Sequence, residues 1–185
     1  RASSLKLINM AYKKKQPIIL VCQISSEVDE PGYSDLYHVG VAAKVIRIFE
    51  MPGGTTTAIM QSAGPKVHLD GIVRTQPYMR GMVTEMEEIV EDEQSDEFKA
   101  LMESCKDLAN KYVEKSERLS PDTSFAIKNL DHPTILVNFI CTNFPFNVDE
   151  KVQLLRYDNL KDRMYKLIQI LNREVRLADI RQAIQ

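Results

Sequence analysis

The pattern of hydrophobic and polar positions predicts a long, bent β-hairpin between residues 36 and 61. From Val45 to Met51 the odd-numbered side chains would share one face of a strand and the intervening ones the other. Pro52-Gly53-Gly54 supplies a turn, and Thr55–Gln61 is typical of a returning strand. Gly40 interrupts the first strand, where a glycine usually marks a bulge.

One helix and three shorter strands are expected around this hairpin. The helix precedes Pro17, is capped by Ser3 or Ser4, and shows apolar residues at helical spacing in Leu5, Ile8, Ala11 and Tyr12. Short apolar runs bounded by turn residues predict the strands. These strands are Ile18–Ile24, Val67–Leu69 and Tyr78–Glu88, with a polar loop at Ser25–Ser34 and a turn at Ala63-Gly64-Pro65.

Helical spacing replaces strand alternation after an acidic run between Glu85 and Glu97. Ser95 is a suitable N-cap for a helix whose seam is Phe98, Leu101, Cys105, Leu108 and Tyr112. Further helices begin near Pro121, Pro133 and Asn147, and a last one, capped by Asp158, runs to the final residue. The acidic run is interpreted as a solvated connector, or alternatively as a dock for a basic partner. We therefore expect two lobes, residues 1–92 and 93–185.

Composition narrows the class of protein. The 185 residues are 44% apolar and 27% charged, with a net charge of −2, which is ordinary for a globular domain. No basic excess exists to bind phosphate, so nucleic acid is not an expected partner. No apolar stretch reaches a membrane-spanning length and no signal segment opens the chain. Three widely spaced cysteines without a CxxC motif predict buried free thiols and a cytoplasmic location.

Motifs for small-molecule chemistry are missing from the sequence. Neither a GxxxxGK[ST] nor a GxGxxG motif occurs, so no nucleotide or other cofactor is expected to bind this chain. His38, His68 and His132 are isolated and lack metal-ligand spacing, so no metal site is expected. We expect no catalytic residues.

Methionines in the β-rich half are the candidate binding residues. Flexible thioether side chains suit surfaces that accept irregular partners, although they also fill cores. Because alternate side chains of a strand face opposite sides of the sheet, some of these methionines must be exposed or covered by another element. The predicted apolar patch consists of Phe49, Met51, Met60 and Met79.

Ordered motifs along the chain carry a resemblance to a known family. The first half has Leu-Tyr-x-Val-Gly at residues 36–40, the alternating strand, and Pro-x-Gly-Thr at residues 52–55. The second half has Leu-Asp-x-Pro at 130–133, Asn-x-Pro-Phe at 143–146, Glu-Lys-x-Gln-Leu-Leu at 150–155, and the helix Arg163–Glu174. Together these resemble the N-terminal domain of Lon, the ATP-dependent AAA+ serine protease.

The resemblance implies an α+β fold in which a PUA-like twisted sheet or barrel precedes a helical bundle that ends in a long helix. In Lon relatives, a segment like Arg1–Ser4 follows a first strand, so that strand is expected to be missing here. One departure concerns residues 62–65, Ser-Ala-Gly-Pro, where the family usually reads Gly-x-x-Arg. Ser-Ala-Gly also resembles part of the nucleophile loop of the Lon protease domain, but a turn is the expected role.

The function that the resemblance implies is non-catalytic. Such a domain binds unfolded or degron-bearing proteins and helps to assemble a ring, hexameric in the parent protein. ATP, Mg²⁺ and a Ser-Lys dyad are expected only in domains outside this fragment. Three alternatives stay open: a stand-alone substrate adaptor carrying the same domain, an RNA-binding module, and a self-standing hydrolase.

Overall fold

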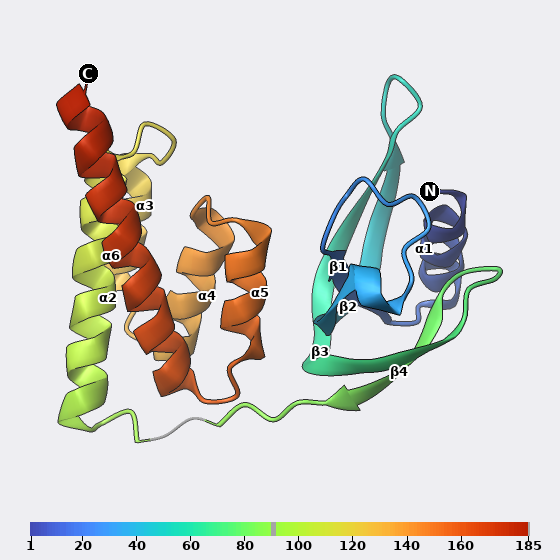
Figure 1. The fold of residues 1–185 in the computed structure, drawn as a ribbon, viewed down its shortest axis with the longest axis horizontal. Coiled ribbons are helices and arrows are strands. Elements are labelled where there is room, and N and C mark those ends of the chain that lie inside the picture. Colours follow the sequence, from blue (N-terminus) through green and yellow to red (C-terminus); the bar gives the residue numbers. More distant parts are fainter. Residues whose placement is uncertain (90–91, 185) are drawn as a thin grey trace. The chain divides into compact units, whose positions relative to one another are not determined.

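The computed structural model of this chain, which describes residues 1–89 and 92–184, has an antiparallel sheet in its first half and packed helices in its second (Figure 1). The α+β fold with a long last helix is confirmed. Two units divide the chain, Arg1–Glu87 and Glu88–Gln185. The acidic run spans this division, and Glu91 of that run lies outside the described residues.

The sheet unit is a meander in which each strand pairs with the next along the chain. Its strand order, β1-β2-β3-β4, makes β1 and β4 the two edges. The elements are α1 (Ala2–Lys14), β1 (Ile18–Gln23), the 3₁₀ turn η1 (Tyr33–Asp35), β2 (Leu36–Glu50), β3 (Thr56–Arg74) and β4 (Arg80–Glu85).

Strand β3 is longer than the sequence predicts, at 19 residues. The expected turn at 63–65 and the separate strand at 67–69 are wrong, because one continuous strand passes through both. Val41 pairs with Lys66 and Ala43 with Ser62, so three residues of β3 lie opposite the single residue between them. This bulge accommodates Pro65, which has no N–H to give to the ladder.

Gly40 adjoins an irregularity in the β1–β2 ladder, in agreement with the sequence prediction. It pairs with Val21, but the next pair is Gln23 with Leu36, so three residues of β2 lie opposite Cys22. On its other side Gly40 pairs regularly with Val67. A Cβ at Gly40 would lie 2.6 Å from the carbonyl oxygen of Leu20. Glycine is therefore required here because β1 approaches β2 too closely for a side chain.

The hairpin turn is confirmed. Gly53 and Gly54 have φ angles of 98° and 85°, which glycine adopts without steric cost. The amide of Met51 donates to the carbonyl of Thr55 at 2.7 Å. The two strands therefore continue in pairing as far as this tight turn.

Helix α1 packs on the sheet with part of the predicted face, Ile8 and Ala11. Ala11 is buried, and Leu7 and Ile8 pack against the small core that Ala11 forms with sheet residues. Leu5 and Tyr12 are instead exposed. The helix begins at Ala2 with Arg1 at the N-cap position, so the predicted serine caps are wrong.

The helical unit is built around two long parallel helices. Glu97 and Lys161 pair at 3.1 Å near the starts of α2 and α6, and Lys115 pairs with Asp179 near their other ends. No helix in the described ranges is long and apolar enough to cross a membrane. The helices are α2 (Asp96–Lys115), α3 (Pro121–Asn129), α4 (Pro133–Asn143), α5 (Val148–Arg156) and α6 (Leu160–Ile184).

Side-chain caps fix where α2 and α6 begin. The Ser95 hydroxyl accepts from the Phe98 amide at 3.2 Å, which confirms the predicted cap of α2. The α6 cap is Asn159, which accepts from the Lys161 amide at 2.8 Å, and not the predicted Asp158. Asn and Asp are equally good N-caps. Because Asp158 and Asn159 are adjacent, the sequence alone does not show which of them caps α6.

Candidate functional site

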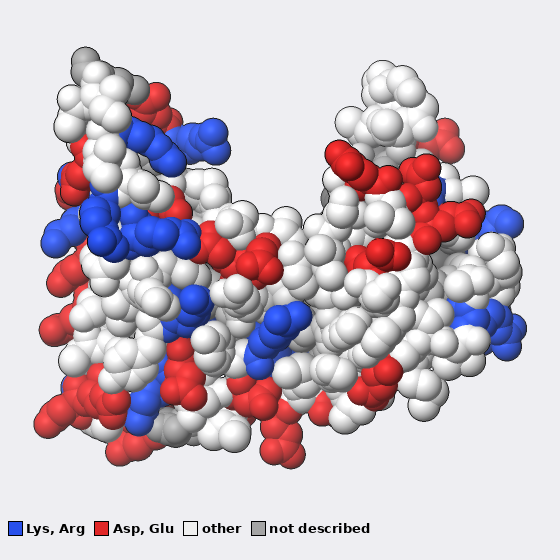
Figure 2. Space-filling view, in the orientation of Figure 1, with Lys and Arg blue, Asp and Glu red and all other residues white. Residues whose placement is uncertain are grey.

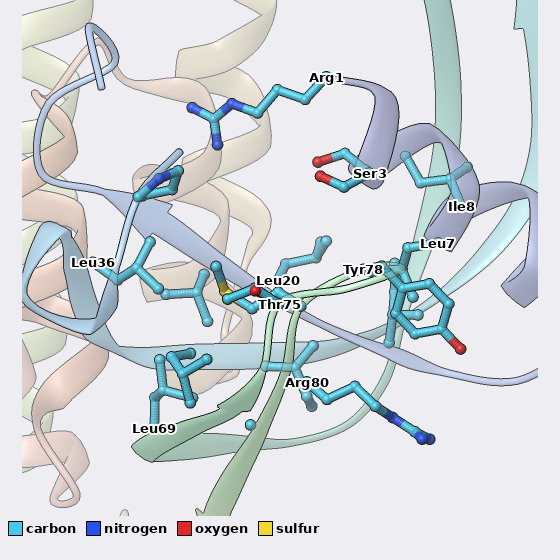
Figure 3. Close-up of a pocket in the computed structure, with 18 of the residues that line it drawn as sticks. Arg1, Ser3, Leu7, Ile8, Leu20, Leu36, Leu69, Thr75, Tyr78 and Arg80 are labelled. Atoms are coloured by element: carbon cyan, nitrogen blue, oxygen red, sulfur yellow. The ribbon is translucent and has the colours of Figure 1, made fainter. Parts of the chain in front are cut away.

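The sheet unit contains a half-open cavity of about 690 Å³, within the usual size range of ligand sites. It lies between α1, the edge strand β1, and β4 with the turn before it (Figure 3). Most of the side chains on its walls are apolar. Among them are Leu7, Ile8, Leu20, Leu36, Leu69 and Ile72.

The chain reversal after α1 places both the helix and β1 on this cavity. Lys15 adopts the left-handed conformation, with φ at 55°, and the Gln16 amide donates to the Ala11 carbonyl at 3.1 Å. Pro17 cannot continue the helix, and Ile18 starts β1 as a buried residue. The short connection between α1 and β1 therefore fixes the position of the helix relative to the strand.

Polar side chains on the rim of the cavity form hydrogen bonds with the loop that follows β1. The Arg1 guanidinium donates to the Val28 carbonyl at 2.9 Å and also to the Gln23 side chain. The Gln23 amide group in turn donates to the Ser25 and Val28 carbonyls, both at 3.0 Å. Arg80 extends its guanidinium away from the labelled apolar side chains (Figure 3). The hydrogen bonds of Arg1 and Gln23 order the loop after β1.

The four residues of the predicted patch fall into two separate pairs. Met60 and Met79 are half-buried and line the cavity, and Met60 also packs against the core under α1. Phe49 and Met51 are 37% and 47% exposed and lie near the end of the hairpin, away from the cavity lining. Ile48 packs on the core, so its neighbour Phe49 faces the opposite side of the hairpin.

The outer face of the hairpin carries further apolar side chains, because Ile46 and Ile59 are also exposed. The Phe49 ring lies 5.4 Å from the guanidinium carbon of Arg47. Figure 2 shows the tip of the β2–β3 hairpin covered by uncharged side chains, and residues 51–61 contain no charged residue. The hairpin is thus a second exposed apolar surface.

Sequence reasoning missed most of the cavity wall. The methionine pattern pointed to Met60 and Met79 but gave no reason to add Leu7, Leu20 or Leu69, which come from three different elements. Each of these looks like an ordinary core residue within its own segment. Only the tertiary arrangement turns them toward a shared space.

A polar network on β2, β3 and β4 contains the two histidines of this unit. His38 stacks on Tyr33 with ring centroids 3.9 Å apart, and its Nε2 lies 2.9 Å from the Tyr33 carbonyl oxygen. His68 Nδ1 lies 2.7 Å from Asp70, whose other oxygen accepts from the Thr84 hydroxyl at 2.6 Å. The hydrogen bonds from Thr84 and His68 lower the pKa of Asp70.

The network and the cysteines offer no recognised reactive centre. Across residues 1–89 and 92–184, no group of three or more His, Cys, Asp or Glu side chains is placed to hold a metal ion. Burial raises the thiol pKa of Cys105 to about 12 and that of Cys141 to about 11, which keeps both protonated at neutral pH. Cys22 is exposed, contrary to the prediction that all three thiols are buried.

An apolar cavity and an apolar hairpin on a sheet, followed by a helical bundle, define a two-unit α+β binding domain. The chain belongs to the family described as the ATP-dependent protease La (LON) substrate-binding domain, which matches residues 1–173. This confirms the family resemblance carried by the sequence motifs.

Relatives of similar sequence agree with that assignment. The chain is 39% identical to a Lon protease of Parabacteroides distasonis and 35% identical to one of Porphyromonas gingivalis, over its full length in each case. It spans about a fifth (22%) of the length of each of these relatives.

The fold is shared with two solved structures. The N-terminal domain of a Mycobacterium avium complex Lon protease has a TM-score of 0.59 at 19% identity, covering 84% of this chain and 90% of that one. A Lon N-terminal domain protein from Xanthomonas campestris also has a TM-score of 0.59, at 13% identity, covering 89% and 82%. At these identities the likeness concerns the fold alone.

Proposed function

We propose that this chain binds exposed apolar segments of unfolded or degron-bearing proteins and delivers them to an ATP-dependent protease of which it is one domain. The observation that carries the proposal is the apolar cavity of about 690 Å³ in the sheet unit. The description of the family, a substrate-binding domain, supports the same role. The chain itself breaks no bond in this proposal.

Low sequence specificity follows from the chemistry of the cavity. Apolar walls with three methionines, Met10, Met60 and Met79, can adapt to side chains of different shapes. Unfolded proteins have exposed apolar side chains in common, but no common sequence. Such a site therefore distinguishes unfolded proteins from folded ones and does not recognise a particular sequence. The exposed hairpin around Phe49 and Met51 extends the apolar contact for longer segments.

Assembly of the parent protein into a ring would strengthen weak binding. We propose that the parent chain forms a hexamer and that this domain assists its assembly. Several linked sites raise apparent affinity by about 10²–10⁴ without any new contact. In the same proposal, ATP, Mg²⁺ and a Ser-Lys dyad belong to domains outside residues 1–185. Three free cysteines suit a reducing compartment, here the cytoplasm.

A titration with a permanently unfolded protein tests the proposal. Fluorescently labelled, carboxymethylated α-lactalbumin would be titrated with the 185-residue chain and with single Glu variants, and the Kd read from anisotropy. We expect Met79→Glu, which puts a charge in the cavity, to weaken binding about tenfold or more. Met51→Glu should weaken it less, because the hairpin end is only an extension of the site.

Phe125→Glu is the matched control, since Phe125 is 72% exposed on α3 of the helical unit. Its Kd should equal that of the unchanged chain. Thermal unfolding of every variant would be measured in parallel. Absence of saturable binding, or a loss of affinity that only tracks a loss of folding, would refute the proposed function.

A further inference from the structure

The sheet unit and the helical unit are joined by very few residues. On the sheet side, β4 is followed by Met86, whose amide donates to the Lys66 carbonyl at 3.0 Å. On the helical side, the carboxylate of Glu88 is bound by the Arg163 guanidinium. Glu87 therefore stands between a residue attached to the sheet and a residue attached to the helical unit.

Glu87 itself is unattached. Within residues 1–89 and 92–184, its side chain is exposed and the residue takes part in no hydrogen bond or ion pair. Its backbone angles can therefore change without breaking an interaction of its own. Hinges in proteins consist of a few residues of this kind, which absorb the change in φ and ψ. Residues 86–88 are called the joint below.

The chain that leaves the joint is attached to α6 through its backbone as well. The Ile89 amide donates to the Asp158 carbonyl at 2.6 Å, and the Ile89 carbonyl accepts from the Leu160 amide at 3.1 Å. Arg163, which holds the joint through its buried guanidinium, lies in the first turn of α6. A rotation at the joint consequently carries α6 with it.

We propose that the two units reorient as rigid bodies about Glu87, with the Arg163–Glu88 contact limiting the joint on the helical side and α6 acting as a lever arm. This inference goes beyond the proposed function and does not depend on it. A helix of 25 residues is about 38 Å long. A rotation of about 20° at the joint would then displace the far end of α6 by about 13 Å.

The rest of the acidic run is less suited to such a rotation. The turn before α2 is closed by the Ser95 amide, which donates to the Asp92 carbonyl at 3.2 Å, and the Ser95 side chain caps α2. Glu97 in the first turn of α2 pairs with Lys161 of α6 at 3.1 Å. Rotation at this turn would separate α2 from α6, whereas rotation at Glu87 leaves their packing intact.

Double electron–electron resonance tests the joint, because it measures the distribution of distances between two spin labels, one in each unit. The labels are attached to Thr57→Cys on β3 and Asn172→Cys on α6, which are both exposed positions. Cys22→Ser first removes the exposed natural thiol. Cys105 and Cys141 stay in place, since burial keeps their thiols protonated and unreactive.

Glu87→Pro is the test variant. Proline fixes φ and restricts the residue before it, and no hydrogen bond in the described ranges uses the Glu87 amide. The distribution should be broad in the unchanged chain and about twofold narrower in Glu87→Pro, since one of the two free backbone angles is fixed.

Glu93→Pro is the matched control from the same acidic run. Glu93 is the second residue of the turn that the Asp92 carbonyl and the Ser95 amide close, a position where proline is favoured. The distance distribution of this variant should equal that of the unchanged chain. A narrow distribution in the unchanged chain, or equal widths in Glu87→Pro and Glu93→Pro, would overturn the assignment of the joint to Glu87.

Glu88→Ala tests the joint in the opposite direction. Loss of the contact with Arg163 should lengthen the joint and broaden the distance distribution, whereas an unchanged width would overturn the limiting role of that contact. Thermal unfolding of every variant is measured in parallel, and Glu88→Ala still decides the matter if Glu87→Pro fails to fold. No substrate is present in these measurements, so their outcome is separate from that of the proposed function.

Discussion

The guanidinium of Arg163 in α6 is bound to the carboxylate of Glu88, 75 positions earlier in the chain, at 2.5 Å. The Arg163 side chain is 7% exposed and also donates to the Leu154 carbonyl at 3.0 Å and the Tyr157 carbonyl at 2.7 Å. Ile89 and Asn159 form a backbone bridge beside this pair. One buried cation thus fixes the start of the helical unit to the loop that precedes its longest helix.

Replacing Arg163 with methionine should lower the free energy of unfolding of the helical unit by about 2–4 kcal/mol, because buried carbonyl groups would lose their donor. Urea unfolding followed by circular dichroism measures this change. Glu88→Gln is the milder variant, since the Glu88 side chain is 36% exposed and the amide can still accept. Equal stability of Arg163→Met and the unchanged chain would contradict the role given to the buried guanidinium.

Gly40→Ala should destabilise the sheet unit by about 1–3 kcal/mol, since the new methyl group would meet the Leu20 carbonyl and separate β1 from β2. Gly71→Ala is the matched control in the same sheet, because a Cβ there has no atom within 4 Å. Its thermal midpoint should stay close to that of the unchanged chain. A similar loss in both variants would show that strand propensity, and not the close approach, sets the cost.

Met60→Asp should destabilise the sheet unit by about 2–4 kcal/mol, because it puts a carboxylate against the apolar core under α1. Met51→Asp changes an exposed residue near the hairpin turn and should alter stability by less than about 0.5 kcal/mol. Thermal unfolding of the two variants measures the contrast. If Met60→Asp is as stable as Met51→Asp, Met60 does not contribute to that core.

The Asp70 carboxyl should titrate below its ordinary pKa, because Thr84 and His68 both hydrogen-bond to the ionised form. A lowered pKa in the folded state means that Asp70 favours folding above its unfolded pKa. That contribution is lost as the pH falls through the folded pKa. Carbon-detected NMR of the side-chain carboxyl would give the value directly.

Thr84→Val removes the first of these hydrogen bonds and should move the Asp70 pKa upward. An unchanged titration curve in that variant would show that the hydroxyl does not stabilise the carboxylate.

Local sequence signals were enough for most elements and failed where pairing across strands decided the outcome. The glycines at 53 and 54 and the cap at Ser95 act within a few residues, so their signals survive in the sequence. The turn expected at residues 63–65 is absent because β2 continues to pair with β3 on both sides of Pro65. Pro65 would interrupt an isolated strand, but a bulge in the β2–β3 pairing accommodates it. That bulge can be seen only when the two strands are considered together.

Alternation, helical spacing and ordered motifs along the chain were enough to predict the α+β class, the hairpin with its turn, the seam of α2 and the family. Tertiary structure alone decided which side chains share a surface. It brought Met60 and Met79 to one cavity, left Phe49 and Met51 on the hairpin, and turned Leu7 rather than Leu5 toward the sheet. The physical reason is that strand register and helix rotation are set by packing against distant segments, and these two choices fix the face to which each side chain belongs.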